Sequence, residues 1–394
     1  MKSPGRILII PSWYPPDGGY FFKEHSEAIL GTGWQVDVLV NRVVGIRKVF
    51  QHGRSALGGY KVGSENGLRV IRSVYLKIPG SEEQNIQRWS AGTARLYKRY
   101  EKEFGKPDLI LTHSVTWAGF AASLIKKLYG IPYVVVEHRS FFVWSTEKAR
   151  NMVKPYYLPF FEEAYRNCSS LVLVSESLLT GLKELLPWIE EKTRTIPNMI
   201  REDMFLPPTM TRNREPFVFL WAGRLEHVKG VDLLIEAAQI LKERGKDNFF
   251  IRLAGKGSLQ NELEKQASEA GVSDVVTFLG RISREEMQKE MQMAACFVLP
   301  TRYEAFGAVL IEAMATGLPV IATRSGGPDT IVSSDNGILI DTENAEQLAR
   351  AMEDMMLRIN EFSEQEIREQ TMDRYGQNSV MKQYNKLFLE LLQE

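Results

Sequence analysis

Residues 217–244 read FVFLWAGRLEHVKGVDLLIEAAQILKER, and this stretch indicates the fold class. The apolar run Phe217–Gly223 predicts a strand, and Asp232–Arg244 carries its apolar residues at helical spacing. A strand that is apolar on consecutive residues is typical of a parallel sheet covered on both faces, and successive parallel strands are joined by helical crossovers. The stretch therefore predicts one strand–helix unit of an α/β protein.

The same alternation runs through both halves of the chain. We expect strands at Arg6–Pro11, Val36–Asn41, Leu68–Ser73, Leu109–His113, Tyr133–His138 and Leu171–Ser175, and then at Phe217–Gly223, Phe250–Gly255, Val275–Leu279, Phe297–Pro300, Val320–Thr323 and Gly337–Ile340. A chain of 394 residues is too long for one hydrophobic core. The aperiodic segment FLPPTMTRNREP at 205–216 is typical of a linker.

These observations predict two doubly wound, Rossmann-like domains that face a central cleft. The first domain covers residues 1–205 and the second covers residues 206–377. The last amphipathic helix, about Asn378–Leu392, is expected to pack back on the first domain, so that residues 378–394 join it. In such sheets ligands bind beyond the carboxyl ends of the strands.

The composition, 44% hydrophobic and 25% charged, is typical of a soluble globular protein. No apolar run is long enough to cross a membrane, and the N-terminus lacks the pattern of a signal peptide. Cys168 and Cys296 have neither zinc-site nor disulfide spacing. We therefore expect a cytoplasmic protein with no bound metal.

Charge is unevenly distributed. Residues 1–200 carry 27 Lys and Arg against 18 Asp and Glu, whereas residues 201–394 carry 22 against 31. Residues 42–77 hold eight of the cations and one acidic residue, Glu65. We interpret 42–77 as a basic and apolar loop that contacts the inner face of the plasma membrane or a phosphate-bearing acceptor; a solvated charged loop is the alternative. Nucleic acid is not expected, because the basic segment lacks interleaved aromatic residues.

The strongest chemical signal is PTRYEAFGAVLIE at 300–312. A strand ends there, a polar loop carries Glu304, and a helix that starts near Phe306 carries Glu312 within an apolar segment. A carboxylate in such a segment needs a polar partner, and a pair of ribose hydroxyls would serve. The free N–H groups of Gly307 and Ala308 at the helix start suit a diphosphate. Alternatively, Glu304 complements the helix dipole and Glu312 is solvated.

A second signal is the loop after Phe217–Gly223. Gly223 permits close approach of a ligand to the backbone, and two cations, Arg224 and Lys229, follow before the next helix. Such cations could hold a diphosphate and neutralise the charge that develops on it as a leaving group. An ordinary charged surface loop is the alternative.

Taken together, Gly223-Arg224-Leu225 with Lys229-Gly230, Gly255-Lys256-Gly257, and Glu304 with Glu312 resemble the motifs of glycosyltransferase family 4. The resemblance implies a retaining group 1 glycosyl transferase with the GT-B architecture. Arg224 and Lys229 would hold the donor pyrophosphate, Glu304 the donor sugar and Glu312 the ribose. The resemblance further implies donor contacts from Gly223, Gly255, Phe306, Gly307 and Ala308, and a nucleobase pocket lined by Phe278 through Ile282.

The resemblance extends to the first domain. In SWYPPDGGYFFKEH, residues 12–25, Gly18 and Gly19 would lie near the donor phosphates, although a plain turn is the alternative. His138 occupies the position where the family often has a histidine that contacts the donor sugar. A role as general base would require a neutral imidazole, and the family has no firmly assigned base. His113 is expected to be structural or to lie on the acceptor side.

The predicted activity is transfer of a hexose from a nucleotide sugar, UDP first and GDP second, to a glycan or polyprenyl-linked acceptor in cell-surface polysaccharide synthesis. We expect no cofactor and no divalent ion, because two cations already serve the leaving group. The competing hypotheses are a nucleotide-sugar epimerase, a GDP-sugar-dependent mannosyltransferase, a sugar-binding module and a dehydrogenase. The last requires a G-x-G-x-x-G motif, of which Gly255-Lys256-Gly257 lacks the third glycine.

Overall fold

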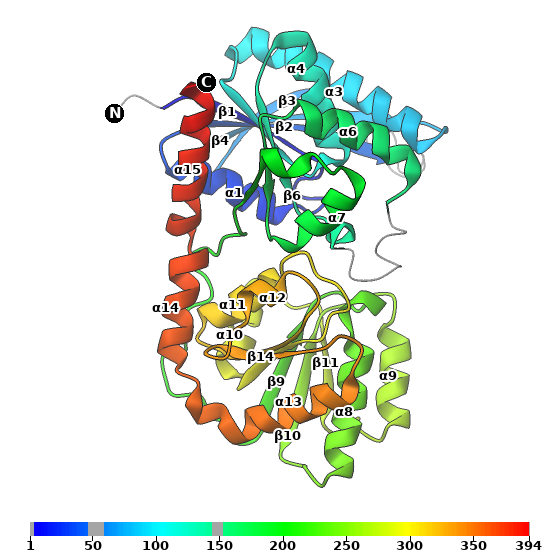
Figure 1. The fold of residues 1–394 in the computed structure, drawn as a ribbon, viewed down its shortest axis with the longest axis vertical. Coiled ribbons are helices and arrows are strands. Elements are labelled where there is room, and N and C mark those ends of the chain that lie inside the picture. Colours follow the sequence, from blue (N-terminus) through cyan, green and yellow to red (C-terminus); the bar gives the residue numbers. More distant parts are fainter. Residues whose placement is uncertain (1–3, 46–58, 144–152, 394) are drawn as a thin grey trace.

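The computed structural model describes residues 4–45, 59–143 and 153–393, which form two α/β domains, each with helices packed on a central sheet (Figure 1). The predicted α/β class is therefore confirmed. The first sheet lies within residues 6–195 and the second within 217–340.

The first domain contains an eight-stranded sheet with the order β3-β4-β2-β1-β5-β6-β7-β8. Its strands are β1 (Arg6–Pro11), β2 (Gln35–Gly45), β3 (Lys61–Glu65), β4 (Leu68–Lys77), β5 (Leu109–His113), β6 (Tyr133–Glu137), β7 (Ser170–Leu173) and β8 (Thr193–Thr195). Its helices are α1 (Tyr20–Gly31), α3 (Glu82–Phe104), α4 (Phe120–Tyr129), α6 (Leu158–Asn167) and α7 (Ser177–Leu185), with the short turns η2 (Val115–Gly119), η3 (Ser140–Phe142), η4 (Pro155–Tyr157) and η5 (Ile189–Lys192).

The described part of the basic segment 42–77 corrects the prediction of a loop, except at Leu68–Ser73, where a strand was predicted and β4 is found. Residues 42–45 end β2, and residues 61–77 form β3 and β4 with the turn between them, while 46–58 lie outside the described residues. β3 pairs antiparallel with β4 through a turn in which Asn66 and Gly67 both have positive φ, as two-residue hairpins favour. β3 escaped prediction because it is an exposed edge strand, where charged side chains prevent edge-to-edge pairing.

The second domain contains a parallel six-stranded sheet with the order β11-β10-β9-β12-β13-β14. Its strands are β9 (Phe217–Ala222), β10 (Phe249–Ala254), β11 (Val276–Gly280), β12 (Cys296–Leu299), β13 (Val320–Thr323) and β14 (Gly337–Ile340). Its helices are α8 (Val231–Glu243), α9 (Gln260–Glu269), α10 (Arg284–Met293), α11 (Ala308–Ala315), α12 (Pro328–Ile331), α13 (Ala345–Arg358) and α14 (Glu364–Tyr375), with the turns η6 (His227–Lys229) and η7 (Ile359–Glu361). α11 begins two residues after Phe306, where its start was expected, because Gly307 is left-handed with φ 95°.

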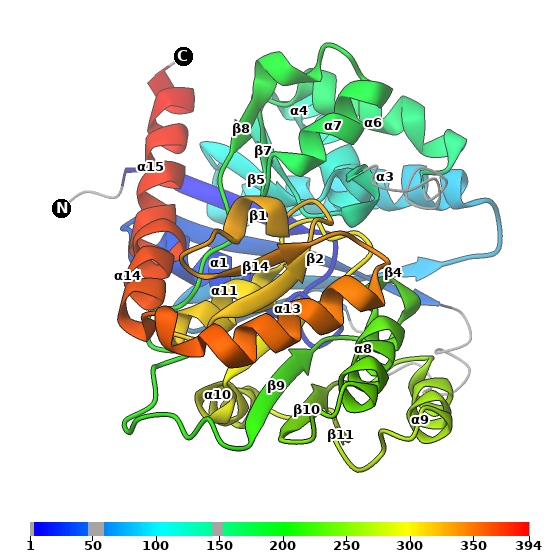
Figure 2. The same cartoon turned by 60° about the horizontal axis from the view of Figure 1, so that its bottom comes forward.

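The last helix, α15 (Gln377–Gln393), lies beside the first domain, whereas α14 lies beside the second (Figures 1 and 2). The Trp34 indole N–H donates to Asn385 Oδ1 at 2.9 Å, and the ring of Phe388 lies 5.8 Å from that of Trp34. Helix α15 therefore completes the first domain although it is last in the sequence.

The two connections between the domains are joined to each other. The Ile200 N–H donates to the Tyr375 carbonyl at 2.8 Å, and the Gln377 N–H donates to the Ile200 carbonyl at 2.9 Å. The segment before β9 and the start of α15 therefore cross between the domains side by side.

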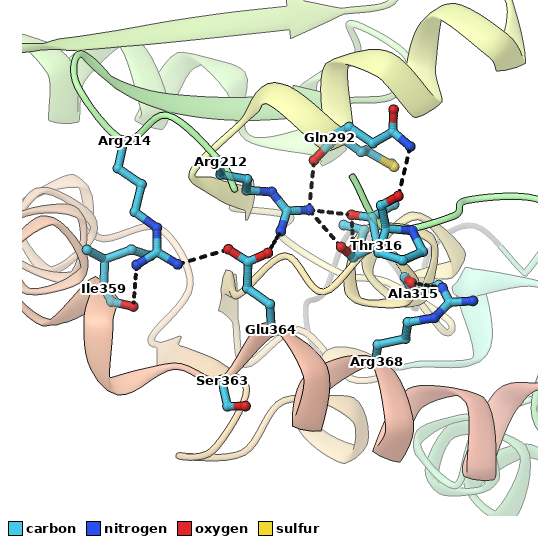
Figure 3. Close-up of polar contacts among 12 residues, drawn as sticks. Arg212, Arg214, Gln292, Ala315, Thr316, Ile359, Ser363, Glu364 and Arg368 are labelled. Atoms are coloured by element: carbon cyan, nitrogen blue, oxygen red, sulfur yellow. Dashed lines mark hydrogen bonds and ion pairs between the residues drawn. The ribbon is translucent and has the colours of Figure 1, made fainter. Parts of the chain in front are cut away.

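Arginines of the linker and of α14 hold the carboxyl end of α11 (Figure 3). Arg212 is buried; it donates to the Thr316 carbonyl at 2.7 Å and pairs with Glu364. Arg214 also pairs with Glu364, at 2.9 Å, and Arg368 donates to the Ala315 carbonyl. Arg212 and Arg368 satisfy carbonyls that the helix end leaves free and complement its dipole, so α11 is anchored at the end opposite to its start.

Within the three described ranges, no helix combines the length and the apolar character needed to cross a bilayer.

Candidate active site

Two predicted site residues, Lys229 and Glu304, form an ion pair. Lys229 ends η6, in the loop after β9, and Glu304 lies in the loop after β12. Because β9 and β12 are neighbours in a parallel sheet, their following loops meet at the same sheet edge. The Lys229 Nζ lies 2.6 Å from Glu304 Oε2, and both side chains are mostly buried. The Glu304 backbone is fixed by its N–H donating to the Ser325 carbonyl at 2.8 Å.

Arg224 lies on the same edge, and its side chain is exposed. Burial raises the pKa of the Tyr303 hydroxyl, and the positive charge of Arg224 opposes that rise, so the guanidinium lies near the residue that precedes Glu304. Among the described residues, the Arg224 guanidinium has no ion-pair partner. It is therefore free to bind an anion that enters the cleft.

The start of α11 faces the same region. Gly307 caps the helix in the left-handed conformation, and the Leu310 N–H closes the first turn onto the Gly307 carbonyl at 2.8 Å. The N–H groups of Ala308 and Val309 precede that first bond and have no partner within the helix. The side chain of Phe306 is buried, and its ring lies 5.8 Å from that of Tyr375.

Glu312 lies one turn further along α11 and lines a small cavity with Ala308, Phe21 and Arg284. Burial raises the pKa of Glu312 to about 7, Arg284 opposes the rise and Glu24 adds to it. Arg284 forms an ion pair with Glu24 of α1, so residues of both domains enclose this carboxylate. Glu312, which was predicted to bind the ribose, therefore lies between the two domains.

Gly223 and Gly255, two predicted site residues of the second domain, lie where the loops after β9 and β10 pack against each other. A Cβ added to Gly255 would lie 1.8 Å from the Gly223 carbonyl oxygen. The Gly255 N–H donates to the Gly280 carbonyl at 2.8 Å, which continues this packing to the edge strand β11. Phe278 in β11 and Ile282 after it are partly buried against the core. Gly223 and Gly255 thus shape the loops that carry Arg224, whatever else they contact.

The predicted glycine pair of the first domain also has a steric role. Gly19 precedes α1 with φ 72°, and a Cβ there would lie 2.5 Å from the Trp13 carbonyl oxygen. Gly18 has φ 108°. The turn starts α1 so that Phe21 packs edge-on against His138, with ring centroids 5.6 Å apart. Since Phe21 also lines the cavity of Glu312, the turn links the predicted residues of the two domains.

His138 follows β6 and is half-buried, with its Nε2 3.2 Å from Nδ1 of His113. Burial lowers the pKa of His138 to about 3, and the nearby Asn198 side chain opposes this shift. The imidazole is therefore neutral at physiological pH. His113 is fully buried, at the end of β5.

Sequence reasoning missed Glu137, a buried carboxylate that positions the loop of His138. It accepts hydrogen bonds from the N–H groups of His138 and Arg139, both at 3.0 Å, from the Val115 N–H at 3.0 Å and from the Tyr165 hydroxyl at 3.0 Å. A carboxylate directly after the apolar run VVV was the available signal. No signal in the sequence pointed to Glu24 and Arg284, which pair across the domains.

The domains touch on two sides of this region. The Ser175 hydroxyl donates to the Ala305 carbonyl at 2.5 Å, and Glu24 pairs with Arg284. The loop of Glu304 and the start of α11 therefore lie where the two domains are in contact.

A cavity of about 340 Å³ opens beside the carboxyl ends of β1, β2 and β4. Its lining includes the aromatic residue Trp13 and the cations Arg42, Lys61 and Arg72, with Asp17 as the acidic member. Arg42 pairs with Asp17. Arg72 pairs with Glu65, and its guanidinium lies over the ring of Tyr14, so Lys61 is the lining cation without an ion pair among the described residues. The cavity combines positive charge with an aromatic wall, which suits a sugar that bears an anionic group.

Comparison with known proteins covers both domains. The family described as "Glycosyl transferases group 1" matches residues 207–377, and "Glycosyltransferase Family 4" matches residues 19–203. A D-inositol 3-phosphate glycosyltransferase of Pseudarthrobacter chlorophenolicus is 36% identical over 355 residues, which are 84% of this chain and 80% of that protein.

Solved structures share the arrangement. Sucrose-phosphate synthase from Thermosynechococcus elongatus superposes with a TM-score of 0.78 at 20% identity, over 98% of this chain and 99% of that one. HepE of Anabaena, in complex with UDP and glucose, gives a TM-score of 0.72 at 18% identity, also over 98% and 99%. These likenesses confirm the predicted fold of two Rossmann-like domains.

Proposed function

Since this chain belongs to the group 1 glycosyl transferases of Glycosyltransferase Family 4, we propose that it moves a hexose from a nucleoside diphosphate sugar to a glycan or lipid-linked glycan. Membership makes the protein an enzyme, a glycosyltransferase with the GT-B architecture. The proposed reaction retains the anomeric configuration, uses a UDP-sugar in preference to a GDP-sugar, and serves cell-surface polysaccharide synthesis.

The observation that carries the proposal is the cationic edge formed by Arg224 and the Lys229–Glu304 pair beside the start of α11. In the reaction the bond from the anomeric carbon to the β-phosphate oxygen breaks, and its electron pair stays on that oxygen. Arg224, Lys229 and the free N–H groups of α11 stabilise the developing negative charge. Glu304 holds the Lys229 ammonium in place, and its carboxylate is close enough to this edge to accept a hydrogen bond from a sugar hydroxyl.

The acceptor hydroxyl attacks the anomeric carbon on the face that the diphosphate leaves, and its proton passes to a departing phosphate oxygen. This sequence retains the configuration and balances the proton without a protein base. It also requires no divalent ion, because two side-chain cations meet the leaving group.

Two observations support the substrates. HepE, which shares the fold, binds UDP and glucose, which favours UDP as the nucleotide. The cavity beside β1, β2 and β4 carries Arg42, Lys61 and Arg72, which favours an acceptor with a phosphate, such as a polyprenyl-diphosphate-linked glycan at the inner face of the plasma membrane.

The test is a thermal-shift screen of UDP, GDP and ADP sugars, followed by incubation of the best donor with lipid-linked and phosphorylated acceptors. We expect UDP-sugars to raise the melting temperature most, and a product whose anomeric proton coupling matches the donor, with the same rate in excess EDTA. Conversion of donor to an isomeric nucleotide sugar in the absence of acceptor would show an epimerase instead. An inverted product or a rate abolished by EDTA would contradict the mechanism.

A further inference from the structure

Two buried histidines and the half-buried His138 form a chain of hydrogen bonds. His25 Nδ1 lies 3.3 Å from His113 Nε2, and His113 Nδ1 lies 3.2 Å from His138 Nε2. His25 is 2% exposed and His113 0%. Burial lowers the pKa of all three rings below the ordinary histidine range, so each ring is neutral and carries one N–H at physiological pH.

The three hydrogen-bonded histidines allow only two arrangements of their protons. Each nitrogen–nitrogen contact must hold one proton, because two N–H groups or two lone pairs facing each other make no hydrogen bond. Three neutral rings supply three protons, and the two contacts take two of them. The third lies on an outer nitrogen, either Nε2 of His25 or Nδ1 of His138.

The surroundings of the two outer nitrogens differ. Nε2 of His25 is buried and has no hydrogen-bond partner among the described residues. Nδ1 of His138 belongs to a half-buried side chain after β6 and is not among the buried atoms that lack a partner in the described residues. A buried N–H without an acceptor is costlier than an unused lone pair, so the third proton belongs on His138 Nδ1.

We propose that His25 and His113 are positioning residues that hold His138 in the Nδ1–H form, so that it acts in the proposed transfer as a hydrogen-bond donor and not as a base. The role in transfer rests on the proposed function; the tautomer does not. In this arrangement His25 Nδ1–H donates to His113 Nε2, and His113 Nδ1–H donates to His138 Nε2. The only lone pair of the His138 ring is thereby occupied, which leaves it no site to accept a proton.

Packing fixes the chain from several elements. Phe22 of α1 stacks on His113 with ring centroids 4.3 Å apart, and Tyr384 of α15 lies 4.5 Å from His25. Phe21, which touches His138, also lines the cavity that holds Ala308 and Glu312. The tautomer of His138 is thus set by the buried rings of His25 on α1 and His113 on β5. Helix α15 packs against His25 through Tyr384.

The decisive measurement is a proton-detected ¹⁵N correlation spectrum of the protein labelled at its five histidines, assigned by single substitutions. We expect His138 Nδ1 to appear as the protonated nitrogen and Nε2 as the unprotonated one, from pH 6 to 8. A spectrum with His138 Nε2 protonated overturns the inference. No substrate is needed, so this result stands apart from any failure to find transfer activity.

Two variants of His25 test the link. His25→Leu removes the donor to His113, whereas the amide of His25→Asn replaces Nδ1–H with an N–H at the same place. We expect His25→Leu to shift His138 toward the Nε2–H form and to lower kcat about tenfold with the donor KM within twofold, as loss of one hydrogen bond in the transition state would. His25→Asn should restore both the spectrum and kcat.

Loss of activity in His25→Leu with an unchanged His138 tautomer would make His25 merely structural and overturn the link. Should His25→Leu fail to fold, the wild-type spectrum and the His25→Asn variant still decide. A His25→Asn spectrum with His138 Nε2 protonated contradicts the proposal as directly as the same result in the wild type.

Discussion

The Lys229 ammonium lies 2.6 Å from the Glu304 carboxylate, although the two residues are 75 positions apart. Each comes from the loop after one of two neighbouring strands, β9 and β12. The pair keeps a cation in place at the sheet edge where α11 begins, and Arg224 stands beside it without an ion-pair partner among the described residues. Charge that develops on a departing diphosphate would therefore meet preorganised cations.

The first prediction concerns Lys229. Lys229→Ala should lower kcat/KM about a hundredfold or more, equivalent to roughly 3 kcal/mol of barrier, because one leaving-group cation is lost. Steady-state kinetics with the best donor measure this. Lys242→Ala is the matched control, since Lys242 also forms an ion pair, with Asp274 at 2.8 Å, but at the other end of α8. If both variants turn over alike, Lys229 does not meet the leaving group.

The second prediction concerns Glu312, whose pKa burial raises to about 7. If Glu312 binds the ribose as proposed, its ionised carboxylate would accept hydrogen bonds from two hydroxyls, so nucleotide binding should favour that form and weaken as pH falls. If only the carboxylate form binds, the Kd for UDP should rise about tenfold from pH 8 to pH 6, by linkage. Calorimetric titration measures it, and Glu312→Gln reports the titration of the UDP phosphates alone. Equal pH slopes for the two proteins would remove Glu312 from the ribose site.

The third prediction separates backbone strain from steric conflict at Gly19. Gly19 and Gly130 have nearly the same φ, 72° and 70°, but a Cβ at Gly19 meets the Trp13 carbonyl at 2.5 Å whereas one at Gly130 meets nothing within 4 Å. Gly130→Ala should cost about 1–2 kcal/mol, the penalty of the left-handed region. Gly19→Ala should cost more and also lower activity, because α1 must shift. Urea unfolding and initial rates test this; equal costs would show that the turn tolerates a side chain.

The fourth prediction is acid lability from the histidine chain. Burial lowers the pKa of His25 to about 3, from an ordinary 6.5 in the unfolded chain. Between these values the unfolded state binds a proton that the folded state does not, so stability falls as pH decreases from 6.5 toward 3. Each such histidine contributes a slope of up to about 1.4 kcal/mol per pH unit.

His25→Asn isolates one of these contributions. Below pH 6.5 the unfolding free energy of the wild type should fall by about 1.4 kcal/mol per pH unit more than that of His25→Asn, because the variant lacks this histidine. Urea unfolding at pH 7, 6 and 5 measures the difference between the two proteins. A difference that does not change with pH would mean that His25 is not held neutral.

The fifth prediction concerns the arginines at the end of α11. Arg212 is 6% exposed and donates to Thr316 as well as pairing with Glu364, so Arg212→Ala should destabilise the protein by about 3 kcal/mol. Arg214 pairs with the same carboxylate from a more exposed position, and Arg214→Ala should cost about 1 kcal/mol or less. Thermal unfolding distinguishes them. The order would be reversed if the buried contacts of Arg212 contribute little.

Several elements were predictable because their signal is local. The strands Arg6–Pro11, Leu109–His113, Val320–Thr323 and Gly337–Ile340 have the bounds that the apolar runs predicted. Such runs are apolar on consecutive residues because helices cover both faces of a parallel sheet. β3 lacks this pattern, since it lies at an exposed edge, and so it was missed.

The amino-acid sequence by itself determined the α/β class and the loops after strands that carry Arg224, Lys229 and Glu304, because burial and turn chemistry act over a few neighbouring residues. It indicated the glycosyltransferase family through the resemblance of its motifs. Only the tertiary structure decided that Lys229 pairs with Glu304, that Glu24 of the first domain meets Arg284 of the second, and that His25 and His113 stand behind His138. The physical reason is that strand order and domain contact bring together side chains far apart in the chain, and no local periodicity records which of them will meet.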